Sequence, residues 1–146
     1  MPAYPGAANS TTPTMPPPLS IGPGDWAYVF GTGAQFGSGK SPTLETFAAG
    51  IASDRVAIAR TPNDSYPSSV SVELIFSGAP GAFEVDLQDS DTDADAYFQS
   101  IAGASLTAVS ANNTARLEQI PLKGKFARLY IKTLTNAVNI AARLTR

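Results

Sequence analysis

Two segments, VSVELIF (70–76) and AFEVDLQ (82–88), carry the clearest strand pattern in the chain, and SGAPG (77–81) separates them. Apolar residues occupy every second position in both: Val70, Val72, Leu74 and Phe76 in the first, and Phe83, Val85 and Leu87 in the second. Because side chains alternate between the two faces of a strand, this pattern predicts two half-buried strands. A five-residue connection containing Gly and Pro is typical of a turn, so the two strands are predicted to pair as a hairpin.

Further short segments rich in β-branched and aromatic residues flank this pair. We expect strands at 25–30, 54–60, 97–101, 106–109, 115–120, 126–134 and 137–145, whereas 43–51 fits either a helix or a strand. About eight or nine short strands at regular spacing predict an all-β fold. An antiparallel β-sandwich of jelly-roll type is the expected architecture, and an up-and-down barrel is the alternative.

The first 24 residues differ from the rest of the chain. Residues 1–24 contain seven of the twelve prolines and no charged side chain. Proline fixes φ and lacks a backbone donor, so we predict an extended N-terminal arm over 1–24 and a β-sandwich domain over 25–146. We expect the arm to lie across a neighbouring subunit. The predicted interface residues are Tyr4, Met15, Pro16, Pro17, Pro18, Leu19, Ile21, Trp26, Arg128 and Lys132.

Composition excludes several kinds of chemistry. The 146 residues include no Cys and no His, and the formal net charge is −2. Without His there is no Ser-His-Asp or Cys-His arrangement, and we expect no enzyme activity and no cofactor. No global positive charge favours nucleic acid. We also expect no membrane span and no signal peptide, because no long apolar run is present.

Charged residues are unevenly distributed along the chain. The stretch 61–115 has eight acidic residues and no Lys or Arg, whereas 116–146 has seven basic residues and one acid, Glu118. One interpretation is that strands from the two halves lie together and their charges compensate. The other is that acidic and basic faces meet between subunits.

An aspartate run suggests one metal candidate. Asp89, Asp91, Asp93 and Asp95 alternate with small residues, and Ca²⁺ prefers such oxygen ligands. The EF-hand template fails, because Ala94 and Ser100 stand where it requires Gly and Glu in the register that begins at Asp89. The alternative is an acidic loop whose aspartates cap turns or a short helix that leads to Tyr97. A carboxylate pair for glycoside hydrolysis is a weaker hypothesis on the same residues.

Two further motifs have stronger structural interpretations. AQFGSGKS (34–41) nearly matches a phosphate-binding loop, but Ala34 replaces the first Gly and Pro42 opposes the helix that must follow. In 126–134, Arg128 and Lys132 flank Tyr130, which is a weak version of a single-strand nucleic-acid surface. We expect a surface loop and a half-buried strand, respectively.

Four further stretches of the sequence are FSGAPGAFEVDLQ (76–88), DTDADAY (91–97), KFARLY (125–130) and NAVNIAARL (136–144). Together they resemble small virion structural proteins of tailed bacteriophages and, within that group, the capsid cement or decoration proteins with a jelly-roll domain. The resemblance implies a protein that is assembled in the host bacterial cytoplasm and binds the outer surface of the capsid shell. It also implies the major capsid protein as partner and a homodimer or homotrimer.

A receptor-binding β-sandwich of a phage tail or head fibre is the alternative function. Such a domain recognises host surface glycans through exposed aromatic residues beside polar groups. The candidates are Tyr28, Phe36, Tyr66 and Tyr97. Trp26 is expected to lie in the core or to anchor the arm rather than to stack on a sugar.

Overall fold

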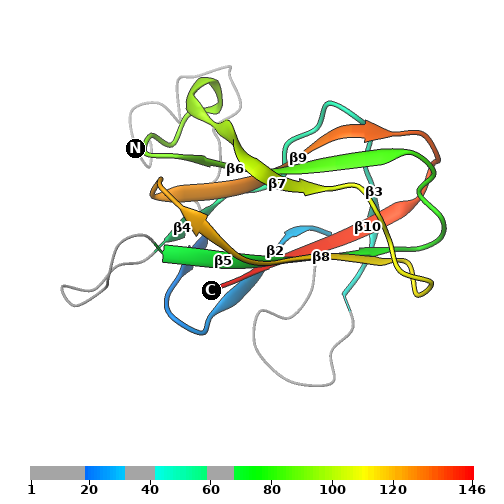
Figure 1. Ribbon diagram of the computed structural model, residues 1–146, viewed down its shortest axis with the longest axis horizontal. Helices are drawn as coiled ribbons and strands as arrows, with labels where there is room; N and C mark the ends of the chain where they lie inside the picture. Colours follow the sequence, from blue (N-terminus) through cyan, green and yellow to red (C-terminus); the bar gives the residue numbers. More distant parts are fainter. Residues whose placement is uncertain (1–18, 32–41, 59–67) are drawn as a thin grey trace, which may run out of the picture.

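Residues 19–31, 42–58 and 68–146 are described by a computed structural model, in which two sheets face each other (Figure 1). Sheet A contains, in spatial order, β1 (Leu19–Ile21), β4 (Val56–Ile58), β9 (Phe126–Leu134), β6 (Phe83–Ser90) and β7 (Gln99–Leu106). Sheet B contains β2 (Trp26–Phe30), β10 (Asn139–Thr145), β5 (Ser68–Phe76) and β8 (Thr114–Leu122), and the two-residue β3 (Glu45–Thr46) also pairs with β10. The predicted all-β, sandwich-like fold is therefore confirmed, while the jelly-roll type stays a prediction.

The strands pair as a set of nested hairpins. β6 and β7 are neighbours in sequence and pair antiparallel. Outward from them along the chain, β5 pairs with β8, β4 with β9, and β2 with β10, all antiparallel. Strands that follow each other in sequence mostly lie in opposite sheets. An up-and-down barrel, in which consecutive strands pair, does not have this order.

The predicted hairpin between 70–76 and 82–88 is wrong, although both strands exist. β5 belongs to sheet B and β6 to sheet A, and the connection at 77–81 crosses between the sheets. Phe76 and Phe83 pack against each other with ring centroids 5.1 Å apart, across the core rather than along one sheet. Alternation shows which face of a strand is buried, but not which strand lies beside it.

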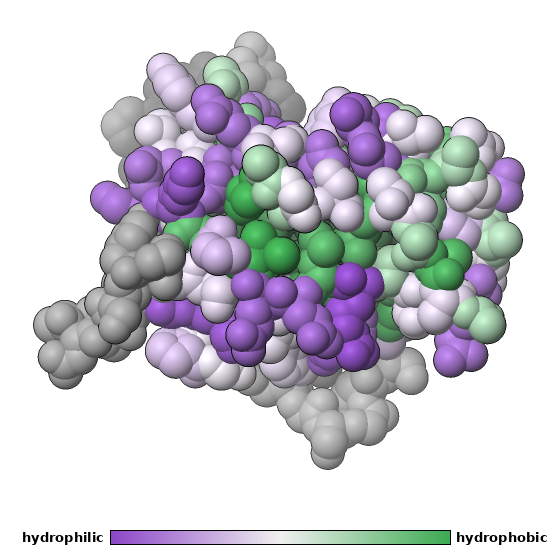
Figure 2. Space-filling model, viewed as in Figure 1, coloured by the Kyte–Doolittle hydropathy of each residue, from purple (hydrophilic) through white to green (hydrophobic). Residues whose placement is uncertain are grey.

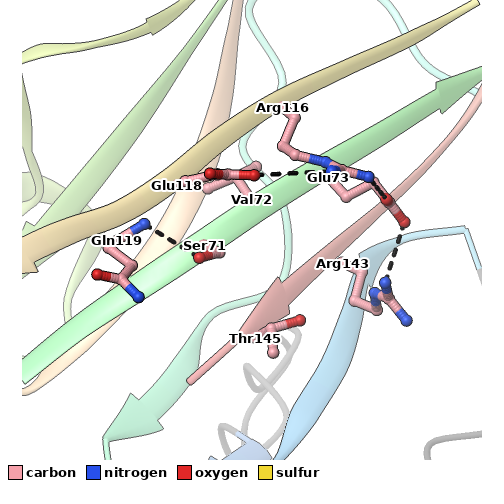
Figure 3. Close-up of a pocket in the computed structure, with 8 residues that line it drawn as sticks. All are labelled: Ser71, Val72, Glu73, Arg116, Glu118, Gln119, Arg143 and Thr145. Carbon is pink, nitrogen blue, oxygen red and sulfur yellow. Dashed lines mark hydrogen bonds and ion pairs between the residues drawn. The ribbon is translucent and has the colours of Figure 1, made fainter.

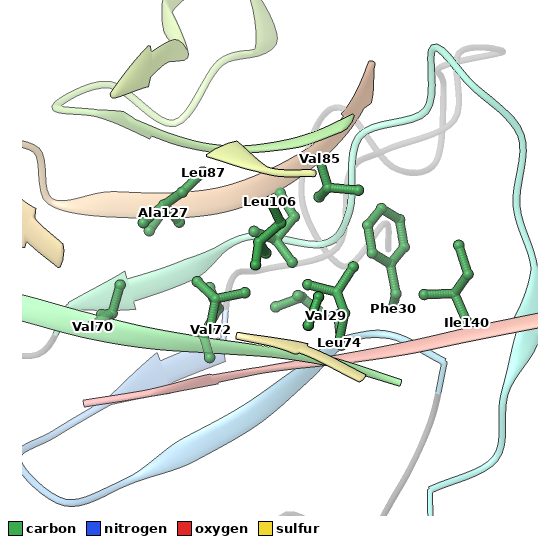
Figure 4. Close-up of a cluster of buried hydrophobic side chains, with 14 of the residues drawn as sticks. Val29, Phe30, Val70, Val72, Leu74, Val85, Leu87, Leu106, Ala127 and Ile140 are labelled. Carbon is green, nitrogen blue, oxygen red and sulfur yellow. The ribbon is translucent and has the colours of Figure 1, made fainter. Parts of the chain in front are cut away.

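Apolar side chains from both sheets fill the space between the layers (Figure 4). Sheet B contributes Val29, Phe30, Val70, Val72, Leu74 and Ile140, and sheet A contributes Val85, Leu87, Leu106 and Ala127. Each fully buried side chain of Val, Leu, Ile or Phe stabilises the fold by about 1.5–3 kcal/mol. The alternating positions read from the sequence are therefore the core positions.

Several element boundaries differ from the predictions. One strand, β7, replaces the two expected at 97–101 and 106–109, and Tyr97 lies in a short 3₁₀ helix, η1 (Asp95–Tyr97). The ambiguous stretch 43–51 contains β3 and no helix.

The end of the predicted arm belongs to the domain. β1 pairs parallel with β4 at the edge of sheet A, with Leu19 opposite Val56 and Ile21 opposite Ile58. Ile21 is only 2% exposed and joins the core. The Ile21 side chain is therefore buried within its own subunit, and the prediction that it contacts a neighbouring subunit is wrong. Residues 1–18 lie outside the described residues.

Charge compensation within the subunit is confirmed by four ion pairs of the described chain. Each joins the acidic stretch 61–115 to the basic stretch 116–146: Glu73 with Arg116 and with Arg143, Glu84 with Lys132, and Asp95 with Arg128. Three of these four pairs join strands that lie side by side in one sheet. The nested pairing brings the two halves of the chain together, which explains the sequence pattern.

Candidate functional site

The outer face of sheet B carries a row of side chains that crosses all four main strands. Glu73 of β5 lies between Arg116 of β8 and Arg143 of β10, and Arg143 lies opposite Tyr28 of β2. Glu73 Oε2 accepts a hydrogen bond from Arg116 at 3.0 Å, and its Oε1 accepts one from Arg143 at 3.1 Å. One carboxylate therefore holds two guanidinium groups from the strands on either side of it.

A second row lies beside the first. Thr145 of β10 is opposite Trp26 on one side and Ser71 on the other. Between Val70 and Val72, β8 carries one extra residue, a β-bulge. Within this bulge Gln119 has a φ of 51°, and its backbone N–H donates to the Ser71 hydroxyl at 3.0 Å. The bulge therefore brings the backbone of Gln119 into contact with Ser71 on this face.

An open hollow of about 380 Å³ lies over these two rows (Figure 3). Its lining residues are Ser71, Val72, Glu73, Arg116, Glu118, Gln119, Arg143 and Thr145. We call it the sheet B hollow. It offers guanidinium donors, carboxylate acceptors, and hydroxyl and amide groups that do both.

Two aromatic rings of β2 lie beside Arg143, which lines this hollow. The guanidinium of Arg143 lies 5.4 Å from the ring centre of Trp26, in cation–π range. Trp26 and Tyr28 meet edge to face, with centroids 5.5 Å apart. Both rings are half-buried, so Trp26 is not a core residue. Nε of Arg143 is buried and has no hydrogen-bond partner among the described residues.

Sequence reasoning did not find the sheet B hollow. Alternation does place Ser71 and Glu73 on the polar face of their strand. Arg116 and Arg143, however, are 43 and 70 residues away from Glu73 in sequence, and only the strand order brings them together. The sequence signal for this cluster was the uneven charge distribution, with acidic residues in 61–115 and basic residues in 116–146.

The residues predicted for an interface are dispersed. Tyr4, Met15, Pro16, Pro17 and Pro18 lie outside the described residues. Leu19 is 37% exposed, whereas Ile21 and Arg128 are buried. Lys132 is exposed and pairs with Glu84 at 3.0 Å, which raises the pKa of its amine through that hydrogen bond. Of this group, Leu19 and Lys132 are therefore the clearly exposed side chains in the described part of the chain.

The aspartate run lies over sheet A, where arginines hold two of its members. Arg55, which precedes β4, binds Asp93 through two hydrogen bonds of 2.5 and 2.8 Å. This pairing lowers the pKa of Asp93 and raises that of Arg55, chiefly through the shared hydrogen bonds. Asp89 accepts the backbone N–H groups of Lys123 and Gly124 at 2.8 and 3.0 Å. The alternative interpretation, an acidic loop that fixes turns, agrees with these contacts.

Arg128 continues this network on β9. It donates to Asp95 at 2.7 Å and to Gln88 at 2.9 Å, and its guanidinium lies 4.2 Å from the ring centre of Phe98. Because Arg128 is 7% exposed, it does not present its charge beside Tyr130 as a nucleic-acid surface requires. Its role here is to hold the segment around η1 against sheet A.

We expect calcium to leave the stability of this protein unchanged. Asp93 pairs with Arg55, which precedes β4, and Asp95 pairs with Arg128 of β9; no group of three potential ligands that could hold a metal occurs in the described residues. Thermal melts in excess calcium and in a chelator should therefore coincide. A higher melting temperature in calcium, lost in a variant with Asp91 replaced by Asn, would show that the run binds the ion.

The remaining sequence motifs give no further site. The loop 34–41, for which a phosphate-binding role was considered, lies wholly outside the described residues. Of the aromatic candidates for sugar binding, Tyr28 lies opposite Arg143 of the sheet B hollow, Tyr97 lies in η1 with 62% exposure, and Phe36 and Tyr66 are outside the described residues. In the part of the chain that the structure describes, no helix has the length and apolarity of a membrane span.

Comparisons of this chain with protein-family models, with curated proteins and with solved structures find no match.

Proposed function

We propose that this chain is a non-enzymatic structural protein of a phage virion, which binds the outer capsid shell and bridges neighbouring capsomers. The resemblance of its sequence to cement proteins suggests this role. The observation that carries the proposal is the edge strand β7, which carries no charged residue and no proline.

β7 differs from the other long edge strand. It forms the outer edge of sheet A, and its sequence QSIAGASL contains no charged residue and no proline. β8, at the edge of sheet B, instead carries Arg116, Glu118, Pro121 and a bulge. Proteins usually protect a free edge with charges, proline or bulges, because an open edge pairs with other chains. β7 also has an irregular register opposite β6, between Ser100 and Ser105, but it lacks the charges and the proline that β8 carries.

An apolar band accompanies this edge. Ile101 of β7 and Leu117 and Ile120 of β8 are partly buried and pack against the core. Figure 2 shows apolar surface between the two layers on the face where β7 and β8 lie in front (Figure 1). Apolar surface beside open backbone groups suits strand addition by a protein partner. The major capsid protein is the partner that we propose.

The nested strand pairs support the jelly-roll type for this domain. A jelly roll arises when one long antiparallel hairpin wraps around a core, so that its paired halves alternate between two sheets. The four pairs β6·β7, β5·β8, β4·β9 and β2·β10 have this order. Jelly rolls are common in viral capsid proteins, which is consistent with the proposed role.

The N-terminal segment is the second proposed contact. Residues 1–18 contain six prolines and no charge, and they lead into β1 at the edge of sheet A opposite to β7. A protein held at two separate places gains avidity from the second contact. Homodimers or homotrimers would multiply this effect.

Deletion of residues 1–18 tests the arm. The variant should melt within about 2 °C of the full chain, because β1 and Ile21 remain in place. It should cosediment with capsids of the phage that encodes this chain at least tenfold more weakly. Deletion of residues 1–24 is unsuitable, because it removes a core strand as well as the arm.

Two results would contradict the proposal. If the truncated chain binds capsids as strongly as the full chain does, then the arm does not contribute to capsid binding. If purified virions carry only the few copies expected of a fibre tip, rather than enough copies to cover the shell, the cement function itself is wrong.

A further inference from the structure

The sheet B hollow has balanced charge. Arg116 and Arg143 supply two positive charges, and Glu73 and Glu118 supply two negative charges. Arg116 also lies 3.6 Å from Glu118, so both guanidinium groups already have carboxylate partners. An anion would meet two carboxylates here and a cation two guanidinium groups. A neutral ligand with many hydroxyl groups avoids both repulsions and pairs with donors and acceptors together.

The polar groups of the hollow come from three strands and converge on one space. Ser71 and Glu73 project from β5, Thr145 and Arg143 from β10, and Gln119 from β8 (Figure 3). The volume of about 380 Å³ falls within the usual range of small-molecule sites. One or two hexose rings are ligands of this size.

The bulge at Gln119 adds an independent observation. A non-glycine residue with φ of 51° is strained, and glycine would adopt this conformation at lower cost. Glutamine nevertheless occupies this position, where its amide side chain lines the hollow and can both donate and accept hydrogen bonds. Local strain of this kind concentrates at ligand sites.

We propose that the sheet B hollow is a binding site for a neutral saccharide of one or two hexose rings. Glu73 accepts from sugar hydroxyls, while Arg116 and Gln119 donate to them. Ser71 and Thr145 supply hydroxyl groups that both donate and accept. This site is separate from the β7 edge, so it stands or falls independently of the capsid role.

The single tryptophan makes a direct titration possible. Trp26 is the only tryptophan in the chain, and its ring centre lies 5.4 Å from the guanidinium of Arg143, which lines the hollow, so its fluorescence reports on this site. We expect the full-length protein to show a saturable change with at least one of maltotriose, cellotriose or mannotriose, at a Kd in the millimolar range. Sulfate and methyl glucuronide serve as the anionic controls and should give no saturable change in fluorescence.

Two variants test the location. Gln119→Gly removes the side chain and relieves the backbone, so it should weaken sugar binding at least about fivefold without lowering the melting temperature. Arg116→Gln, at a side chain that is 62% exposed, should weaken binding to a similar extent and leave the fold intact. Lys132→Ala, an exposed and ion-paired base on sheet A, is the matched control and should bind like the wild type.

Three outcomes overturn the proposal. The first is no saturable fluorescence change with any of the three trisaccharides up to about 50 mM. The second is a response to sulfate or methyl glucuronide alone, which would make the site an anion site. The third is sugar binding that both Gln119→Gly and Arg116→Gln leave unchanged, which would place the ligand elsewhere on the chain.

Discussion

Replacing Ile21 by alanine should lower the free energy of unfolding by about 3 kcal/mol, the typical cost of truncating a fully buried isoleucine. Ile21 is 2% exposed and lies opposite Ile58 where β1 pairs with β4. The substitution leaves a cavity in the core, and it removes apolar atoms whose burial stabilises the folded state. For a chain of this size, the melting temperature should fall by about 10 °C. Urea unfolding followed by Trp26 fluorescence measures the change.

Leu19→Ala is the matched control for this variant. Leu19 lies in the same three-residue strand but is 37% exposed, so its truncation should change the stability by less than about 0.5 kcal/mol. Equal effects of the two substitutions would show that β1 is not docked in the domain as described. Together the two variants locate the boundary between the domain and the segment before it.

Replacing Asp93 by asparagine should destabilise the protein by about 2 kcal/mol at neutral pH. Arg55 is 6% exposed and binds Asp93 through two hydrogen bonds, so the variant leaves a buried guanidinium without its counter-charge. The Asp93 side chain is itself 28% exposed, which places the expected cost below the roughly 3–5 kcal/mol of a fully buried pair. Chemical denaturation of both proteins measures the difference.

This stabilisation should depend on pH with a definite sign. The hydrogen bonds from Arg55 lower the pKa of Asp93 in the folded state, so the unfolded chain takes up the proton first as the pH falls. The contribution is fully present above the unfolded pKa of about 3.9 and is lost as the pH falls through the lower, folded pKa. The difference in stability between wild type and Asp93→Asn should therefore narrow below about pH 4.

Asp91→Asn provides the control in the same loop. Asp91 is exposed and makes no ion pair within the described residues, so its substitution should leave the stability nearly unchanged at every pH. If Asp91→Asn is as damaging as Asp93→Asn, then the acidic loop acts through its total charge and not through the Arg55 pair.

The β1 strand also refines the proposed arm. The segment that remains available to reach another subunit is 1–18, because Leu19–Ile21 already pairs with β4. Residues 1–18 enter the domain at one edge of sheet A, and β7 forms the other edge. The proposed contacts with the capsid therefore lie at opposite edges of one sheet, which is a suitable arrangement for bridging two capsomers.

Local sequence patterns determined much of the fold. The alternation at 70–76 and 82–88 predicted two strands and their buried faces, and the structure confirms both. The structure also has strands in the predicted segments 126–134 and 137–145, in which Leu129, Ile131 and Ile140 are fully buried. These features depend on the two-residue period of a strand, which each segment carries by itself.

Strand partners, and hence the candidate site, were decided only by the tertiary structure. The prediction that 70–76 and 82–88 pair was wrong because both segments pack on one core from opposite sheets. Glu73, Arg116 and Arg143 form one cluster because the nested hairpins place β8 and β10 on either side of β5. A residue's own sequence neighbourhood holds no information about such distant pairing. The sequence determined which side chains point inward and outward, and the order of the strands decided which outward side chains meet.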